Sequence, residues 1–272
     1  MLQTRVLTAL VIFPVTLAVV FLSPPLVFKG IVAILLLGGC REFARISDLS
    51  ARGTAALVFL QALVFAAMFI AWESLDEVAL PLLTLGCLAW LALFLRLSAY
   101  QRDARPDIRF RRMGFASALI SLSFCWFALC WLQDRPQGDV VVFMLLLIIW
   151  ASDTGAYFSG RQFGRRKLAP VISPNKTWEG VYGGVALALL AAWLWSGPIM
   201  DMGLTLPSIA TITIITAMAS IGGDLFISLH KRTVKLADAG KLFPGHGGVL
   251  DRYDSLLAGV PFFALAYGLM TV

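Results

Sequence analysis

The sequence predicts an all-α protein, a polytopic bundle of about nine membrane-spanning helices. Of its 272 residues, 59% are hydrophobic and only 14% are charged, and the mean hydropathy is +0.84. This composition excludes an ordinary soluble domain. A hydrocarbon core about 30 Å thick requires roughly 20 apolar residues per helix, so the chain can supply about nine spans with short loops. The apolar runs lack the alternation of a membrane barrel, and in lipid a helix satisfies its own backbone hydrogen bonds.

Nine apolar segments cover most of the chain. The second is the weakest because it is short and contains Lys29, and the sixth, seventh and eighth carry or border Asp153, Glu179 and Asp224. We divide the chain into five N-terminal spans, residues 1–139, and a C-terminal catalytic region, residues 140–272, with four spans and two polar cytoplasmic loops. In chain order the expected spans are 6–22, 26–40, 54–72, 78–95, 113–132, 140–158, 178–195, 205–228 and 255–271.

Basic residues fall almost entirely on one side of these spans. The N-terminus and the second, fourth, sixth and eighth loops hold 20 of the 22 Lys and Arg residues, whereas only Lys29 and Arg135 fall opposite. Since positive charges in short loops stay in the cytoplasm, we expect a cytoplasmic N-terminus and an extracytoplasmic C-terminus. The expected location is the plasma membrane. Anchoring to anionic lipid would collect the same charges, and we prefer that explanation for the fourth loop. Without interleaved aromatic residues, nucleic acid is not an expected partner.

The sixth loop and its flanks are more polar than topology requires. Asp153 lies within an apolar span, where a carboxylate costs roughly 2.5 to 3.5 kcal/mol, so it should face a polar cavity, a cation or a paired base. The alternative is a structural salt bridge to Arg161 or Arg165. Four polar residues precede a helix expected to begin near Trp178, where hydroxyls and backbone N–H groups favour a phosphate. These residues are Ser173, Asn175, Lys176 and Thr177.

Residues 222–255, GGDLFISLHKRTVKLADAGKLFPGHGGVLDRYDS, contain the second candidate stretch. Helical spacing places Ile227, Ser228 and Lys231 on the same face as Asp224. A Gly/Pro-rich turn follows, in which Gly245, Gly247 and Gly248 permit a close approach to a ligand. Within this turn His246 is more simply a hydrogen-bonded turn residue or a cap than a metal ligand. Three charged residues follow directly: Asp251, Arg252 and Asp254.

Asp224 and Asp251 are the candidate metal ligands. They lie 27 positions apart with the turn between them, so the chain can fold back and bring both carboxylates to one cation. Oxygen ligands of this kind suit magnesium, which binds through one or two carboxylates and substrate phosphates. Lys231, Arg232 and Arg252 could then hold the rest of a polyphosphate.

These residues resemble a known family. SLHKRTVKLADAGKLFPGHGGVLDRYDS, residues 228–255, looks like the signature of the phosphatidate cytidylyltransferases, or CDP-diacylglycerol synthases, and SDTGAYFSGRQFGRRKLAPVISPNKTWEG, residues 152–180, is similar to a second stretch of those enzymes. The resemblance implies magnesium-dependent transfer of CMP from CTP to phosphatidate, which gives CDP-diacylglycerol and pyrophosphate for phospholipid biosynthesis. A homodimer is implied as well.

The resemblance also assigns roles to individual residues. It implies that the catalytic residues are Asp224, Asp251, Lys231 and Arg252, with Asp224 and Asp251 binding magnesium. The implied substrate-binding residues are Ser173, Asn175, Lys176, Thr177, Ser228, Arg232, Gly245, His246, Gly247, Gly248, Asp254 and Asp153.

Two positions depart from the family pattern, because Ile227 stands where a Glu is usual and Ala237 where a Lys is usual. Each departure removes a charge, and we expect Ile227 to lie beside the proposed metal. A divergent paralogue that acts on another phosphorylated lipid, or an inactive binder, is therefore an alternative. A transporter is a further alternative, but it would bind ions through Asp153, Glu179 and Asp224 near the midplane, whereas the polar residues cluster at one face.

Overall fold

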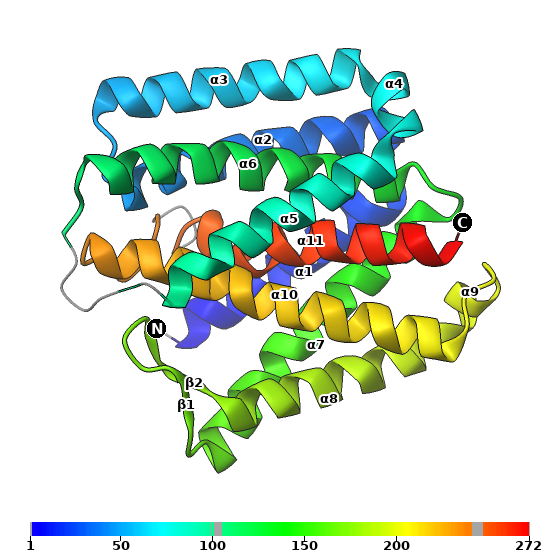
Figure 1. The fold of residues 1–272 in the computed structure, drawn as a ribbon. Coiled ribbons are helices and arrows are strands. Elements are labelled where there is room, and N and C mark those ends of the chain that lie inside the picture. The colour runs from blue at the N-terminus through cyan, green and yellow to red at the C-terminus, as the bar shows by residue number, and fades with distance from the viewer. Residues whose placement is uncertain (1, 99, 101–104, 241–246, 272) are drawn as a thin grey trace.

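The structure is a computed structural model that describes residues 2–98, 100, 105–240 and 247–271 (Figure 1). Helices dominate, and one antiparallel hairpin of two short strands lies between α7 and α8. The elements are α1 (Leu2–Leu22), α2 (Pro25–Ile46), α3 (Ala51–Ile70), α4 (Trp72–Glu77), α5 (Ala79–Ser98), α6 (Ile108–Gln133), α7 (Gly138–Phe163), β1 (Lys167–Ala169), β2 (Ser173–Thr177), α8 (Trp178–Leu194), α9 (Ser196–Met200), α10 (Leu206–Thr233) and α11 (Leu250–Thr271).

The helices confirm an all-α membrane protein. Each predicted span overlaps one long helix, and within the described residues six helices are long and apolar enough to cross a membrane: α3, α5, α6, α7, α10 and α11. The apolar parts of α1 and α8 are shorter, and α2 contains four charged residues. Nine crossings and a cytoplasmic N-terminus therefore stay predictions. The sequence did not predict the hairpin or the short helices α4 and α9.

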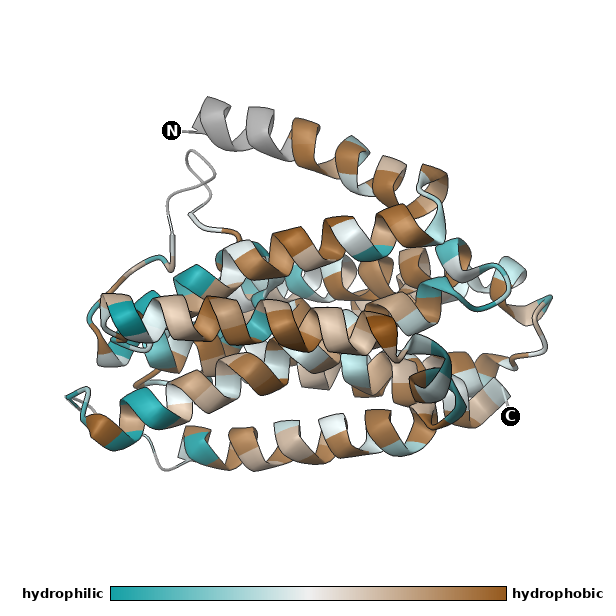
Figure 2. Ribbon diagram, turned by 90° about the horizontal axis from the view of Figure 1, so that it is seen from above, coloured by the Kyte–Doolittle hydropathy of each residue, from teal (hydrophilic) through white to brown (hydrophobic). Residues whose placement is uncertain are grey.

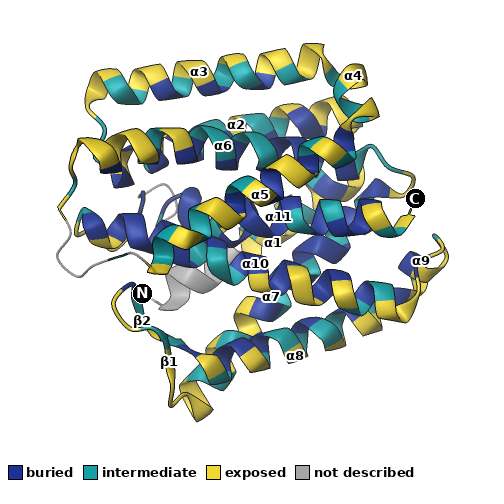
Figure 3. Ribbon diagram, in the orientation of Figure 1, coloured by how far each residue is buried: buried dark blue, intermediate teal, exposed yellow. Residues whose placement is uncertain are grey.

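The core is built around α10 and α11, which pack against each other and against helices from both halves of the chain. Figure 3 shows these helices largely buried, whereas α3 is exposed along the edge of the bundle. Aromatic side chains fill the centre, among them Trp90, Trp126, Phe127 and Phe226, each at most 2% exposed. Apolar side chains exposed on α3, such as Phe59 and Leu63, are expected to face lipid.

Small residues bring α7 and α8 close together. Gly155 on α7 faces the backbone of Gly183 on α8, and Gly184 faces the backbone of Ser152. A side chain at any of these glycines would push the helices apart, which is why small residues recur at tight helix contacts in membranes. The close packing fixes the ends of α7 and α8, from which the hairpin projects.

The two ends of the bundle differ in character. The α2–α3 connection and the hairpin lie at one end, and α4, α9 and the end of α11 lie at the other (Figures 1 and 2). At the second end Lys29 Nζ lies 2.6 Å from Asp134 Oδ2 and 3.7 Å from the centre of the Trp72 ring, and Arg135 pairs with Asp76. The two basic residues predicted on that side are thus both paired with carboxylates.

Candidate active site

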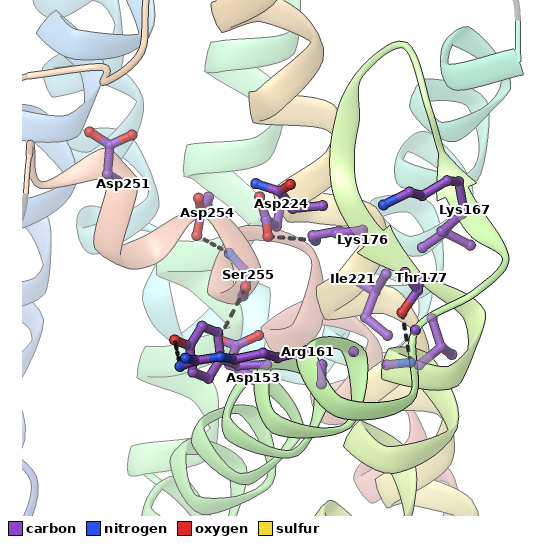
Figure 4. A pocket seen from close by; sticks show the side chains of 18 of the residues that line it. Asp153, Arg161, Lys167, Lys176, Thr177, Ile221, Asp224, Asp251, Asp254 and Ser255 are labelled. Carbon is purple, nitrogen blue, oxygen red and sulfur yellow. Dashed lines mark hydrogen bonds and ion pairs between the residues drawn. The ribbon is translucent and has the colours of Figure 1, made fainter.

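A cavity of about 680 Å³ opens where α7, the hairpin, α10 and the start of α11 meet (Figure 4). Its wall combines the two polar stretches that the sequence singles out, although they are far apart in the chain. Nearly half of the residues in the described lining are charged, with equal numbers of carboxylates and cations. They are Asp153, Asp224, Asp238, Asp251 and Asp254, and Arg161, Lys167, Lys176, Lys231 and Arg252.

The hairpin brings Lys176 to α10. Lys176 lies on β2, and its Nζ is 2.5 Å from Oδ2 of Asp224, with both side chains 26% exposed. The other oxygen of Asp224 accepts a hydrogen bond of 3.2 Å from the Ser228 hydroxyl, one turn along α10. The two predicted stretches therefore meet directly, in an ion pair whose partners both face the cavity.

Thr177 ends the hairpin and begins the next helix. Its hydroxyl accepts a hydrogen bond of 3.1 Å from the backbone N–H of Gly180, so Thr177 is the N-cap of α8, and the predicted start near Trp178 is confirmed. A capping hydroxyl satisfies one of the free N–H groups of a helix start. Thr177 and Asn175 both line the cavity, whereas Ser173 at the start of β2 does not.

Asp251 is held rigidly by three donors. Its Oδ1 lies 2.9 Å from Nζ of Lys231, and its Oδ2 accepts hydrogen bonds of 2.9 Å from the backbone N–H groups of Ala239 and Gly248. Gly247 has φ +83° and turns the backbone tightly around the same carboxylate. Asp251 thus joins the two described ends of the motif loop, which we define as residues 238–250.

Asp153 and Asp254 complete the acidic part of the wall. Asp153 Oδ2 lies 3.5 Å from the Ser255 hydroxyl, and the carboxylates of Asp153, Asp224 and Asp254 are close enough to interact as like charges. Figure 4 shows Asp254 beside Asp224, one turn along α11 from Asp251. No ion pair joins Asp153 to Arg161 or Arg165 among the described residues, so Asp153 faces the cavity, as the first interpretation proposes.

Some predicted residues lie away from the cavity. Arg232 donates to the backbone carbonyls of Ile172 at 3.3 Å and Leu236 at 3.4 Å, and therefore supports the loop that leads into β2. Ser228 donates a hydrogen bond to the Asp224 carboxylate, and the backbone N–H of Gly248 donates one to the Asp251 carboxylate. Gly245 and His246 lie outside the described residues.

The expectation that Ile227 lies beside the proposed metal is wrong. Ile227 is fully buried in the apolar core of the bundle. Successive residues of a helix are rotated by about 100°, so positions 227 and 228 point in different directions. Only Ser228 turns toward Asp224 here. The Ile227 departure therefore affects core packing rather than the cavity wall. Ala237 is exposed, next to Asp238, which does line the cavity.

Glu179 has a different role from Asp153 and Asp224. Glu179 lies in the first turn of α8, and its carboxylate accepts hydrogen bonds of 3.0 and 3.1 Å from the backbone N–H groups of Arg165 and Arg166. It thus fixes the connection between α7 and β1. Three further residues line the cavity that were not predicted for the site: Arg161, Lys167 and Asp238. The high density of polar residues around them in the sequence was the signal that could have identified them.

Comparison with known proteins identifies the family. A sequence model of the cytidylyltransferase family matches residues 3–270. The chain belongs to this family. It is thus an enzyme of nucleotidyl transfer, and the resemblance seen in the two motif stretches is confirmed over nearly the whole chain.

Relatives of similar length give the same result. The chain is 35% identical to a phosphatidate cytidylyltransferase of Haemophilus influenzae, over 98% of this chain and 99% of the relative. It is 37% identical to the enzyme of that name from Pseudomonas aeruginosa, over 97% and 96%. A third phosphatidate cytidylyltransferase, from Bacillus subtilis, is 38% identical over 63% of this chain and 65% of the relative.

Proposed function

We propose that this protein is a phosphatidate cytidylyltransferase, which transfers CMP from CTP to phosphatidate and yields CDP-diacylglycerol and pyrophosphate. The observation that carries the proposal is the ion pair between Lys176 and Asp224, because it joins the two family stretches in one cavity lined by cations and carboxylates. Such a wall suits a reaction between two phosphate groups, since positioning and charge neutralisation supply most of the catalysis in phosphoryl-type transfers.

The charges of the cavity favour a divalent cation as a third component. Five carboxylates balance five basic side chains in the described lining, so the wall has no net formal charge to offset a triphosphate and a phosphatidate headgroup. Its oxygen donors suit magnesium. Among the described residues no three His, Cys, Asp or Glu side chains are close enough to hold a metal by themselves. A magnesium ion here would therefore need oxygen atoms from the substrate phosphates to complete its ligands.

We assign the magnesium to Asp224 and Asp251, with Asp153 and Asp254 as neighbouring carboxylates. When bound, the ion would neutralise charge on the phosphates of CTP. The three donors on Asp251 fix its orientation, whereas the single lysine and the hydroxyl on Asp224 leave this carboxylate more freedom to bind a new partner.

Basic side chains of the cavity would orient the two substrates. A phosphate oxygen competes with Asp224 for the ammonium of Lys176, while Lys231 and Arg252 hold further phosphate oxygens. A phosphatidate oxygen then attacks the α-phosphorus of CTP in line, the bond to the β-phosphate oxygen breaks, and pyrophosphate leaves. The chain itself forms no covalent bond to either substrate.

We infer that the cavity faces the cytoplasm from a nine-span bundle in the plasma membrane. The basic loops lie at the same end as the cavity, and Lys29 and Arg135 at the other end are paired with carboxylates. This distribution follows the positive-inside rule. CTP is a cytosolic nucleotide and phosphatidate a membrane lipid, so a site at this interface reaches both. The family resemblance also supports a homodimer.

The proposal is tested by incorporation of radiolabelled CTP into lipid by the purified protein, with phosphatidate, with and without magnesium. Label in CDP-diacylglycerol is expected only with the metal, and Asp251→Asn should remove it. The matched control is Asp201→Asn, an exposed Asp after α9 at the opposite end of the bundle, which should keep wild-type activity. Folded protein that labels no lipid would overturn the proposal and favour a paralogue for another lipid phosphate.

A further inference from the structure

Glu42 makes a contact that links the N-terminal helices to the motif loop. It lies on α2, and its Oε2 accepts a hydrogen bond of 2.7 Å from the backbone N–H of Leu250, 208 positions away in the chain. Leu250 is the first residue of α11. A carboxylate at a helix start binds free N–H groups and interacts favourably with the helix dipole. Glu42 therefore acts as a cap that a distant helix supplies to α11.

The Glu42 carboxylate also packs against the described ends of the motif loop. The α-carbons of Gly240 and Gly248 lie so close to it that a side chain at either position would collide with its oxygens. One turn along α2, the guanidinium of Arg45 lies 3.4 Å from the carbonyl oxygen of Ala239. One face of α2 thus contacts the loop both where it leaves α10 and where it enters α11.

Glu42 and Asp251 hold the same loop from two sides. Asp251 receives the N–H groups of Ala239 and Gly248 from the cavity side, while Glu42 binds Leu250 from the side of α2. Glu42 does not line the cavity. A change at Glu42 therefore reaches the substrates only through the loop and the position of Asp251.

We propose that Glu42 is a positioning residue for the reaction, which fixes the described ends of the motif loop and thereby the Asp251 carboxylate. This proposal rests on the proposed function, because Asp251 matters to catalysis only if the cavity is the active site. It gives the N-terminal half of the chain a direct part in the site, through α2. A displacement of a catalytic group by even a small distance lowers the rate more than it weakens substrate binding.

Two substitutions in the full-length protein test the proposal. Glu42→Gln keeps the size and one acceptor but loses the charge, and Glu42→Ala removes the contact. We expect kcat to fall about tenfold in Glu42→Gln and further in Glu42→Ala, with KM for CTP changed less than about twofold. Glu73→Gln is the control, since Glu73 is exposed on α4 at the opposite end of the bundle, and it should leave kcat unchanged.

Hydrogen exchange of the purified variants separates positioning from general stability. Faster exchange is expected in peptides that cover residues 238–255, with unchanged exchange in α5 and α8. Wild-type exchange in this segment, wild-type kcat, or an equal increase in exchange throughout the chain would overturn the proposal. Hydrogen exchange is measured without substrate, so it reports on Glu42 whether or not the protein is active. Failure of the wild-type protein to make CDP-diacylglycerol would refute the proposed function alone. Glu42→Gln keeps the test available if Glu42→Ala does not fold.

Discussion

Loss of one partner of the ion pair between Lys231 and Asp251 should strongly destabilise the protein. The two paired atoms are 2.9 Å apart, and the side chains are only 10% and 4% exposed. Removal of one partner of a buried pair costs about 3 to 5 kcal/mol, because the other charge stays buried without compensation. Asp251 keeps the N–H donors of Ala239 and Gly248, so we expect Lys231→Met to lower the free energy of unfolding by the smaller value, about 3 kcal/mol.

Equilibrium unfolding in mixed micelles, with an increasing fraction of denaturing detergent, measures this change. Methionine keeps the length and the apolar stem of lysine, so the substitution removes the charge with little change in packing. A double-mutant cycle with Asp251→Asn isolates the pair, and we expect the double variant to lose at least about 1 kcal/mol less than the sum of the single losses. Arg166→Met is the control, since Arg166 is 68% exposed and pairs with Glu179 at 3.4 Å; it should have no measurable effect.

Two results would refute this reasoning. A loss below about 1 kcal/mol in Lys231→Met would mean that water reaches Asp251 and screens it. Additivity of the two single changes within about 0.5 kcal/mol would mean that the pair contributes nothing beyond its separate parts. Either result would also weaken the view that Asp251 is held in one orientation.

Three further changes have defined outcomes. Asp224→Asn should lower kcat at least about 100-fold in the CTP assay, because it removes a proposed metal ligand that also orients Lys176. Ala237→Lys should raise kcat/KM about fivefold, the equivalent of one interaction of about 1 kcal/mol in a solvated site, if a cation beside Asp238 attracts substrate phosphate. Thr177→Ala should lower the free energy of unfolding by about 1 kcal/mol, measured by detergent unfolding, since it removes the N-cap of α8.

Local sequence patterns were sufficient for the longer helices and for several of the residues that line the cavity. Long apolar runs in a chain that cannot expose its backbone to lipid leave few structures other than helices, and each predicted segment is helical. Asp153 is costly within an apolar span, and Lys176 precedes a helix start that favours a phosphate, so each was a predictable site candidate for its own reason. Both line the cavity.

The pairing of charges within the site was not predictable from spacing. Asp224 and Asp251 were predicted to meet because they lie 27 positions apart with a Gly-rich turn between them. In the structure each carboxylate instead has a lysine partner, and the lysine that meets Asp224 comes from β2, far away in the chain. Contacts of this kind depend on how α8 and α10 pack, which no local pattern records. Whether one ion binds both carboxylates stays a prediction.

Ile227 illustrates a second limit of helical spacing. Helical spacing places a residue three positions from Asp224 on the same face of the helix. However, α10 packs against several other helices, so residues near that face can still be buried in the core. Only part of its surface opens to the cavity, through Ile221, Asp224 and Lys231, while Ile227 joins the core. An apolar residue at position 227 is therefore compatible with an intact cavity wall, although the family usually has a carboxylate there.

The predicted division between residues 139 and 140 places every predicted site residue in the C-terminal region. The described residues of the cavity lining also lie in that region. The packing does not divide in the same way. Helices α10 and α11, which carry Asp224 and Asp251, pack against α2 and α5 from the first half, and Glu42 on α2 binds the first residue of α11. A loop rich in glycine has little structure of its own, because glycine loses more conformational entropy on ordering than other residues do. Helix α2 from the N-terminal half therefore supplies a surface against which the described ends of the motif loop pack.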